Sequence, residues 1–396
     1  MRNLNRFQNL RRDERGVSLV FISCGFMAFL SATTLAIDVG MFMNARSQAQ
    51  NAADAGAHAG AVALVFNSYT NRTPTGPVVQ SAVNAARANR VAGGQVSVGP
   101  DDVTFPLDPA GQADRVQVQV YRTVERGNAV PTLMGSFFGV QRVNITATAT
   151  AEASPANAMT CVKPFMIPDK WIENTDDKGR ADGPWTTSSN FDEFDNHNNP
   201  LPNPDVYIPA GHPGYTGYTV ANDVGTSLVL RAGTGDQPNP SFYFSWKMSN
   251  DIGGNFYRDN IATCNQELLV YDKDNPYFMI QEPGDKSGPT LQGIKDLIAK
   301  DPDATWDNSC KCVHSNFAQS PRVFPIPLFN PQYYAEGKAN GRGASFELAN
   351  FLGFFADYVE NNGKIHGIIT NIIGVVKDTP STAPTDLFPK AIRLVQ

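Results

Sequence analysis

The chain has 396 residues, of which 41% are hydrophobic and 18% are charged, and its formal net charge is −6. This length allows two or three compact units, and the apolar content excludes wholesale disorder. The acidic balance excludes a protein that binds nucleic acid through a basic surface, because such a surface needs an excess of Lys and Arg. With 33 Gly and 28 Pro, the sequence favours many turns over a long helical bundle.

The first predicted element is a membrane-spanning helix at residues 17–37. This stretch carries no charge and, at 1.5 Å per residue, covers about 32 Å, which matches the hydrocarbon layer of a membrane. It is longer than the apolar core of a cleaved signal peptide. The residues that mark the span are Val17, Phe21, Phe26, Phe29, Leu35 and Ile37. Arginines are concentrated before the span, so the positive-inside rule predicts a cytoplasmic N-terminus at residues 1–16 and an exported remainder.

Residues 38–66 are predicted to continue this helix outside the membrane. Residues 41–66 contain no proline and are rich in alanine, which favours a helix. Small residues at Ala49, Ala53, Gly56 and Gly60 form a stripe that another element can approach closely. Two interpretations are open, because the stripe can pack on the protein's own sheet or on the identical helix of a partner.

The sequence around this helix resembles the N-terminal module of TadG-like proteins (TadE/TadG family), which belong to the tight-adherence (Flp) pilus assembly systems of bacteria. The resemblance is carried by the apolar run and by three flanking strings, DERGVSLV at 13–20, IDVG at 37–40 and QAQNAADAGA at 48–57. It implies a membrane-anchored structural or assembly component that contacts other pilus or secretion proteins through this helix.

The resemblance also implies a candidate cleavage site. Similar pilin-like subunits are cut after a glycine and usually carry Glu five residues later. Gly16 is the matching glycine, but Phe21 occupies the position of the glutamate. We therefore expect residues 1–16 to remain attached. The alternative is a processed minor pilin or surface adhesin that leaves the membrane.

Residues 67–153 are predicted to form a pilin-like α/β roll. After a loop at 67–77, residues 78–91 have helical spacing, and residues 95–98, 115–124 and 140–151 have the alternating pattern of strands. Residues 131–139 suggest a short helix with an aromatic ridge. We expect the resulting small antiparallel sheet to lie against the long helix.

Residues 154–396 are predicted to form a loop-rich, mainly β exported domain, so the fold class of the whole chain is α+β. Its clearest helix is at 290–300, and its strand candidates are 227–231, 241–247, 267–271, 322–329 and 364–376. The many aromatic residues of this part favour a β core over a sugar-binding or partner-binding face.

Four of the five cysteines, Cys161, Cys264, Cys310 and Cys312, lie in this exported part, and Cys24 lies in the span. An even number on the exported side is typical of disulfides in the periplasm. Alternate residues of a strand point apart, so we expect Cys161 and Cys264 each to bond one member of the Cys310/Cys312 pair. A metal site that uses His314 with this pair is the alternative, but a second close pair is missing.

No motif for catalysis is found, neither a Gly-x-Ser-x-Gly elbow, nor a phosphate-binding loop, nor a His-Glu-x-x-His helix. Residues 307–311 lack the second serine of the Asp-x-Ser-x-Ser cation loop that some TadG-like proteins carry. Residues 191–199 lack the spacing of a calcium loop, so we expect a solvated turn there. We predict a single-pass protein of the bacterial inner membrane with a periplasmic C-terminal domain, no enzymatic activity, no cofactor and no metal. An exported hydrolase is the remaining alternative, and a surface or glycan ligand has no support in the sequence.

Overall fold

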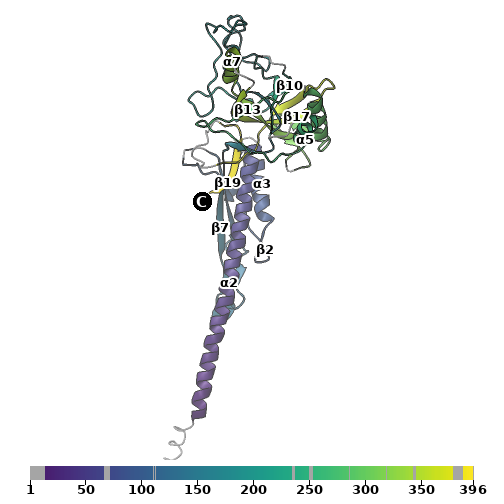
Figure 1. The fold of residues 1–396 in the computed structure, drawn as a ribbon. Helices are drawn as coiled ribbons and strands as arrows, with labels where there is room; N and C mark the ends of the chain where they lie inside the picture. The colour runs from purple at the N-terminus through teal and green to yellow at the C-terminus, as the bar shows by residue number, and fades with distance from the viewer. Residues whose placement is uncertain are drawn as a thin grey trace, which may run out of the picture.

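The computed structural model describes residues 14–66, 72–109, 111, 113–233, 237–248, 253–284, 286–317, 319–341, 345–377 and 387–395. The expected cytoplasmic segment, residues 1–16, lies almost entirely outside this part. Figure 1 shows a long helix, α2 (Glu14–Phe66), that projects from the rest of the protein at one end and is covered at the other. The predicted continuous helix from the span to residue 66 is confirmed.

The projecting half of α2 is apolar, and most of its length contacts no other described part of the protein. An apolar window within Gly16–Phe66 is long enough to cross a membrane and is not buried at all. Hydroxyl groups in this half donate to carbonyls of the preceding turn, as when Ser31 Oγ donates to Met27 O at 2.8 Å and Thr33 Oγ1 to Phe29 O at 3.0 Å. Such bonds satisfy the hydroxyls within the helix itself.

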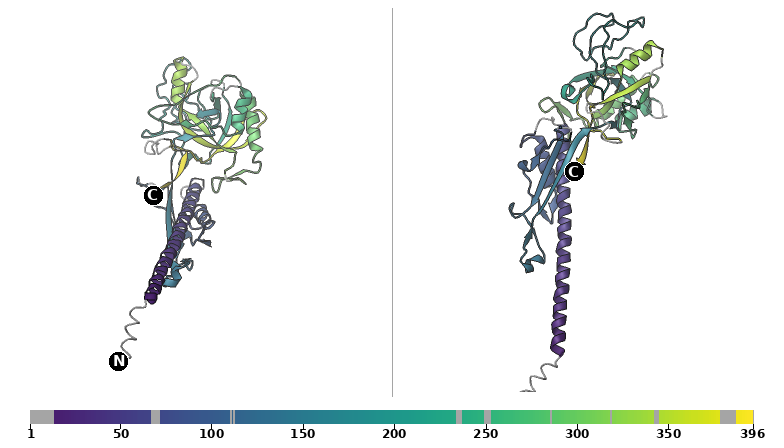
Figure 2. Two further views of the ribbon diagram at one scale, coloured as in Figure 1. Left: turned by 60° about the horizontal axis from the view of Figure 1, so that its bottom comes forward. Right: turned by 90° about the vertical axis from the view of Figure 1, so that its left-hand side faces the viewer.

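A four-stranded antiparallel sheet lies along the second half of α2 (Figure 2), and its strands run in the order β19-β7-β4-β3. Val116, Val118 and Val120 alternate as the buried side chains of β4, as their spacing predicts. Together with the alanines of α2 and the apolar face of α3, they make one core. The elements of this part are α3 (Pro77–Arg87), β1 (Arg90–Val91), β2 (Gly94–Gln95), η1 (Pro100–Asp102), β3 (Val103–Thr104), β4 (Arg115–Arg122), β5 (Val130–Pro131), η2 (Gly135–Phe138), β6 (Arg142–Val143), β7 (Ile145–Pro155) and β19 (Lys390–Val395).

The outer part is built on a seven-stranded sheet in the order β13-β17-β16-β9-β11-β10-β18, and β17 also pairs with β18. This second pairing closes the sheet into a barrel-like form. The long strand β17 makes it possible, because residues 348–355 pair with β16, residues 354–359 pair with β18, and Phe354 and Phe355 pair with both. The strands of the sheet are β9 (Phe165–Pro168), β10 (Ser227–Ala232), β11 (Phe242–Ser245), β13 (Phe278–Ile280), β16 (Val323–Phe329), β17 (Ser345–Val359) and β18 (Ile365–Ile369).

The remaining elements of the outer part surround this sheet. Figure 1 shows α7 at the far end from α2 and α5 at the side. These elements are β8 (Ala158–Met159), α4 (Val220–Asp223), α5 (Gly254–Ala262), β12 (Leu269–Val270), α6 (Ser287–Ile298), β14 (Thr305–Asp307), β15 (Cys312–His314) and α7 (Pro331–Ala339). Aromatic side chains fill the interior, and Trp171, Tyr218, Trp246 and Tyr257 are fully buried. The aromatic residues therefore make a core, as expected.

The predicted fold class is confirmed, with one difference in how the chain is divided. We expected residues 154–396 to form the outer part without interruption. Instead, the C-terminal strand β19 returns and pairs with β7 from Lys390↔Pro155 to Val395↔Thr150, so it belongs to the sheet beside α2. This strand covers an edge that β7 would otherwise expose.

Candidate functional site

The candidate functional site is α2 together with the segments that contact it. The six residues that mark the predicted span (Val17, Phe21, Phe26, Phe29, Leu35 and Ile37) have side chains that are between 49% and 74% exposed. A continuous apolar surface of this size is costly in water but is what a lipid-facing helix presents. The helix therefore fits a single-pass membrane anchor. Gly16 lies inside α2 with open space around it, and cleavage after it stays a prediction.

The stripe of small residues faces the interior of the protein. Ala49 and Ala53 are buried. A Cβ atom built on Gly60 would lie 2.7 Å from Val116 Cγ1, and one on Gly56 would lie 3.0 Å from Ala86 Cβ. Glycine therefore lets α2 approach α3 and β4 at these positions. Of the two interpretations, packing on the protein's own elements is the one that the structure contains.

The opposite face of the covered half of α2 remains exposed. This face carries mostly polar side chains, namely Met43, Asn44, Ser47, Asn51 and His58. A partner helix in the aqueous compartment would therefore meet this face and not the stripe of small residues.

Asp38, at the end of the predicted span, holds a segment of the sheet region against α2. Its carboxylate accepts the backbone N–H groups of Leu133 at 3.0 Å, Met134 at 3.2 Å and Gly135 at 2.6 Å, and the residue is only 5% exposed. Three converging N–H donors satisfy a charge that would be costly to bury alone. Asp38 was predicted only as a helical position, although an acid directly after an apolar run was a signal.

The expected cross-pairing of the cysteines is wrong. The structure joins Cys161 to Cys264 and Cys310 to Cys312. Cys310 is not in a strand, because it lies in the turn of the β14–β15 hairpin, and Lys311 adopts a left-handed conformation with φ 50°. The rule that alternate strand residues point apart therefore does not apply to this pair.

The alternative metal site at this hairpin has competing contacts. Cys310, Cys312 and His314 lie within 4.8 Å of one another. The two sulfurs, however, are bonded to each other, and a metal needs them as thiolates. Hydrogen bonds from the hydroxyl and backbone N–H of Ser309, and next the contact of His314 Nε2 with Asp307 Oδ2 at 3.1 Å, lower the pKa of Asp307 to about 2.

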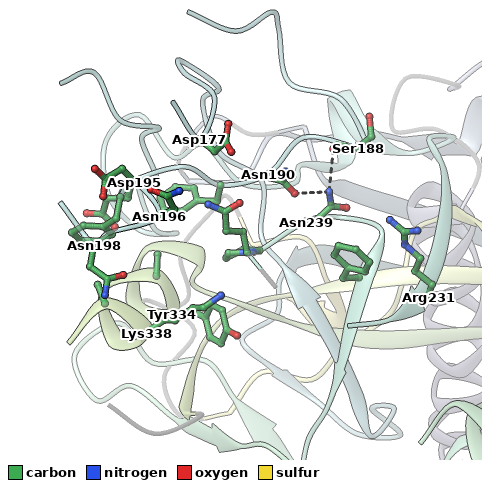
Figure 3. Close-up of a pocket in the computed structure, with 18 residues that line it drawn as sticks. Asp177, Ser188, Asn190, Asp195, Asn196, Asn198, Arg231, Asn239, Tyr334 and Lys338 are labelled. Atoms are coloured by element: carbon green, nitrogen blue, oxygen red, sulfur yellow. Dashed lines mark hydrogen bonds between the residues drawn. The ribbon is translucent and has the colours of Figure 1, made fainter. Parts of the chain in front are cut away.

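The outer part contains a polar groove of about 680 Å³ between the loop at 188–198 and α7 (Figure 3). Asn239 Nδ2 donates to Asn190 Oδ1 at 3.0 Å and to Ser188 O at 3.0 Å, which fixes one wall. Asp195 Oδ1 accepts the N–H groups of His197 at 2.8 Å and Asn199 at 2.9 Å, so its carboxylate caps its own turn. Among the described residues, no histidine lines this groove.

Three buried or half-buried acids cluster near this groove. Carboxylate oxygens of Glu173, Asp192 and Asp205 lie within 4.8 Å of one another. Burial, and next the neighbouring Asp205, raises the pKa of Asp192 to about 7 and that of Glu173 to about 7. Asp205 accepts the N–H groups of Asn174 at 2.8 Å and Asp192 at 2.8 Å, so it ties two loops together. This cluster was not predicted from the sequence, because its members are far apart in the chain.

Comparison with known proteins identifies one segment. Residues 16–63 match a family described as putative Flp pilus-assembly TadE/G-like. No curated protein and no solved structure matches the chain. The match covers the projecting half of α2, Asp38 and the stripe of small residues, so the predicted resemblance is confirmed over this segment.

Proposed function

We propose that this chain, which carries a TadE/G-like Flp pilus-assembly segment at residues 16–63, is a membrane-anchored structural component of a tight-adherence pilus or a related secretion system. The observation that carries the proposal is the coincidence of this segment with a helix that is bare and apolar in one half and packed in the other. Such a helix anchors a domain and holds it at a fixed distance from the membrane.

The proposed orientation places residues 1–16 in the cytoplasm and the domains in the periplasm. The arginines that precede the span support this orientation through the positive-inside rule. Two disulfides in the outer part support it independently, because disulfides persist in oxidising compartments. The proposed membrane is the bacterial inner membrane.

The proposed partners are other assembly proteins of the same system. Because the small-residue stripe is occupied inside the protein, contacts in the periplasm would use the exposed face of α2 and the outer part. A photocrosslinking residue at Met43 or Asn51, both exposed, tests this in cells that make the pilus. The buried position Ala53 is the matched control on the same helix. We expect adducts with assembly proteins from the two exposed positions and none from Ala53; equal absence at all three contradicts the proposal.

The alternative is a processed minor pilin or adhesin, and the mass of the mature protein separates the two. An anchored component retains residues 1–16 and stays in the membrane fraction when surface fibres are sheared off. A processed subunit begins at Val17 and appears in the sheared fibres. Loss of pilus assembly on deletion of the gene, with the wild-type protein found only in membranes, is the result that our proposal predicts.

A further inference from the structure

We propose that the loop between β5 and β6 enters the outer leaflet of the membrane beside α2 and forms a second contact with lipid. This inference rests on the proposed anchoring of α2. The part that enters is the aromatic tip, which we define as Leu133, Phe137, Phe138 and Val140. Phe137 is 83% exposed and Phe138 is 65% exposed, and Leu133 and Val140 are also exposed. Four large apolar side chains at one loop tip are unusual on a surface that faces only water.

The position of the tip is fixed relative to the predicted span. Asp38 binds the backbone of residues 133–135, so this segment lies level with the first residue after the span. From there the tip extends toward the free end of α2, because Phe138 and Val140 line a shallow groove with Ser31, Thr34 and Leu35. Ser31 precedes Asp38 by about two helical turns, or roughly 10 Å. If residues 17–37 cross the membrane, the tip lies beside the last two turns inside it.

Figure 2 shows the same arrangement from the side. In its right-hand view, the narrow end of the sheet region runs down beside α2 toward the projecting half of the helix. The groove of about 330 Å³ between tip and helix has Leu35, Val39 and Phe42 on the helix side. Its walls are therefore continuous with the apolar surface of the span, which argues for lipid chains as the occupant.

The backbone of the tip is suited to a medium without water. Phe137 N donates to Met134 O at 3.1 Å, Gly139 N to Ser136 O at 3.2 Å and Val140 N to Gly135 O at 3.0 Å. The N–H groups of residues 133–135 are taken by Asp38, and Thr132 Oγ1 donates to Val140 O at 2.5 Å. Backbone polar groups that leave water for a membrane have no solvent partners, so these bonds lower the cost of placing the tip there.

The residues that follow the tip fit the lipid headgroup layer. Gln141 and Arg142 are exposed and come directly after Val140 in the chain. A guanidinium at this level can bind lipid phosphate, while aromatic rings below it occupy the interface, as in monotopic membrane proteins. An apolar tip with a cation at its upper edge therefore favours a lipid surface over a protein partner.

Depth-dependent fluorescence quenching tests the inference on the full chain. Cys24 is the one free cysteine among the described residues, so a Cys24→Ala background leaves only an introduced thiol to label. Phe137→Cys carries the probe at the tip, Phe26→Cys is the reference in the span, and Asp303→Cys, on an exposed turn of the outer part, is the aqueous reference. The labelled proteins are reconstituted into phosphatidylethanolamine–phosphatidylglycerol vesicles that contain doxyl-labelled phosphatidylcholine.

We expect the Phe137 probe to be shifted to the blue and quenched most by doxyl groups near the headgroups, the Phe26 probe to be quenched most by doxyl groups deep in the acyl chains, and the Asp303 probe not to be quenched. A Phe137 probe that behaves like the Asp303 probe, while the Phe26 probe is quenched, overturns the loop inference and leaves the anchor in place. Loss of quenching at Phe26 overturns the anchor itself. Probe–probe contact between two copies without lipid quenching would also overturn the inference, since the tip would then bind protein.

Discussion

Replacing Gly60 with alanine tests whether the small-residue stripe of α2 packs inside the protein. Alanine is more favourable than glycine in a helix interior by about 1 kcal/mol. At Gly60, however, the new Cβ would lie 2.7 Å from Val116 Cγ1 and 3.1 Å from Ala82 Cβ, and overpacking of this kind costs about 1–3 kcal/mol. The net effect is between neutral and about 2 kcal/mol of destabilisation. Gly40→Ala on the same helix meets no atom within 4 Å and keeps the full gain.

The assay must report on the sheet beside α2. All four tryptophans lie in the outer part, so their fluorescence does not report on the sheet beside α2. Hydrogen exchange of the β4 amides, residues 115–122, reports directly. We expect Gly60→Ala to speed this exchange by up to about 30-fold, the factor that corresponds to 2 kcal/mol, and Gly40→Ala to slow it by up to about fivefold, the factor that corresponds to its gain of about 1 kcal/mol. Val116→Ala should relieve the contact, so its effect should be smaller in the Gly60→Ala background than in wild type. Exchange as slow in Gly60→Ala as in Gly40→Ala would refute the packing and leave the stripe free for a partner helix.

Three further predictions concern the clamp, which we define as the hydrogen bonds from the backbone of residues 133–135 to Asp38, the effect of pH on stability, and the disulfides. Asp38→Ala leaves the part-buried N–H groups of residues 133–135 without their acceptor. A buried donor left unpaired costs about 1–3 kcal/mol, so hydrogen exchange at these residues in detergent should accelerate about tenfold; unchanged exchange contradicts the clamp. Burial raises the pKa of Asp192 from 3.8 to about 7, so the folded protein binds more protons between these values and its stability falls as pH rises through them. The melting temperature, followed by tryptophan fluorescence, should be higher at pH 5 than at pH 7.5, and Asp192→Asn should reduce this difference; an equal difference in both proteins argues against a buried proton. Mass spectrometry of unreduced peptides should find Cys310 and Cys312 bonded within one peptide, and a cross-link from either to Cys161 would contradict this pairing.

Local patterns predicted much of the part built around α2. The charge-free run at 17–37 predicted a helix, and a composition that favours helix continues without proline to Phe66. The alternation of Val116, Val118 and Val120 places one face of β4 on a core. These patterns depend on neighbours within a few residues, so contacts with distant parts of the chain do not change the structure that they predict.

Features that depend on distant contacts, or on an unusual local backbone conformation, were missed. Nothing near residues 390–395 indicates that they pair with β7 and not with the outer sheet. The clamp joins Asp38 to residues 133–135, and the Cys310–Cys312 bond depends on a left-handed turn at Lys311. A spacing rule for strands could not anticipate that turn.

The topology of the chain is the most direct test of the whole account. Alkaline phosphatase, which is active only after export, and a fluorescent protein that matures only in the cytosol are fused in turn after residue 396. The account predicts an active phosphatase, a dark fluorescent protein and both fusions in the membrane fraction. A fluorescent C-terminus with inactive phosphatase would contradict it, because α2 would then not carry the domains across the membrane.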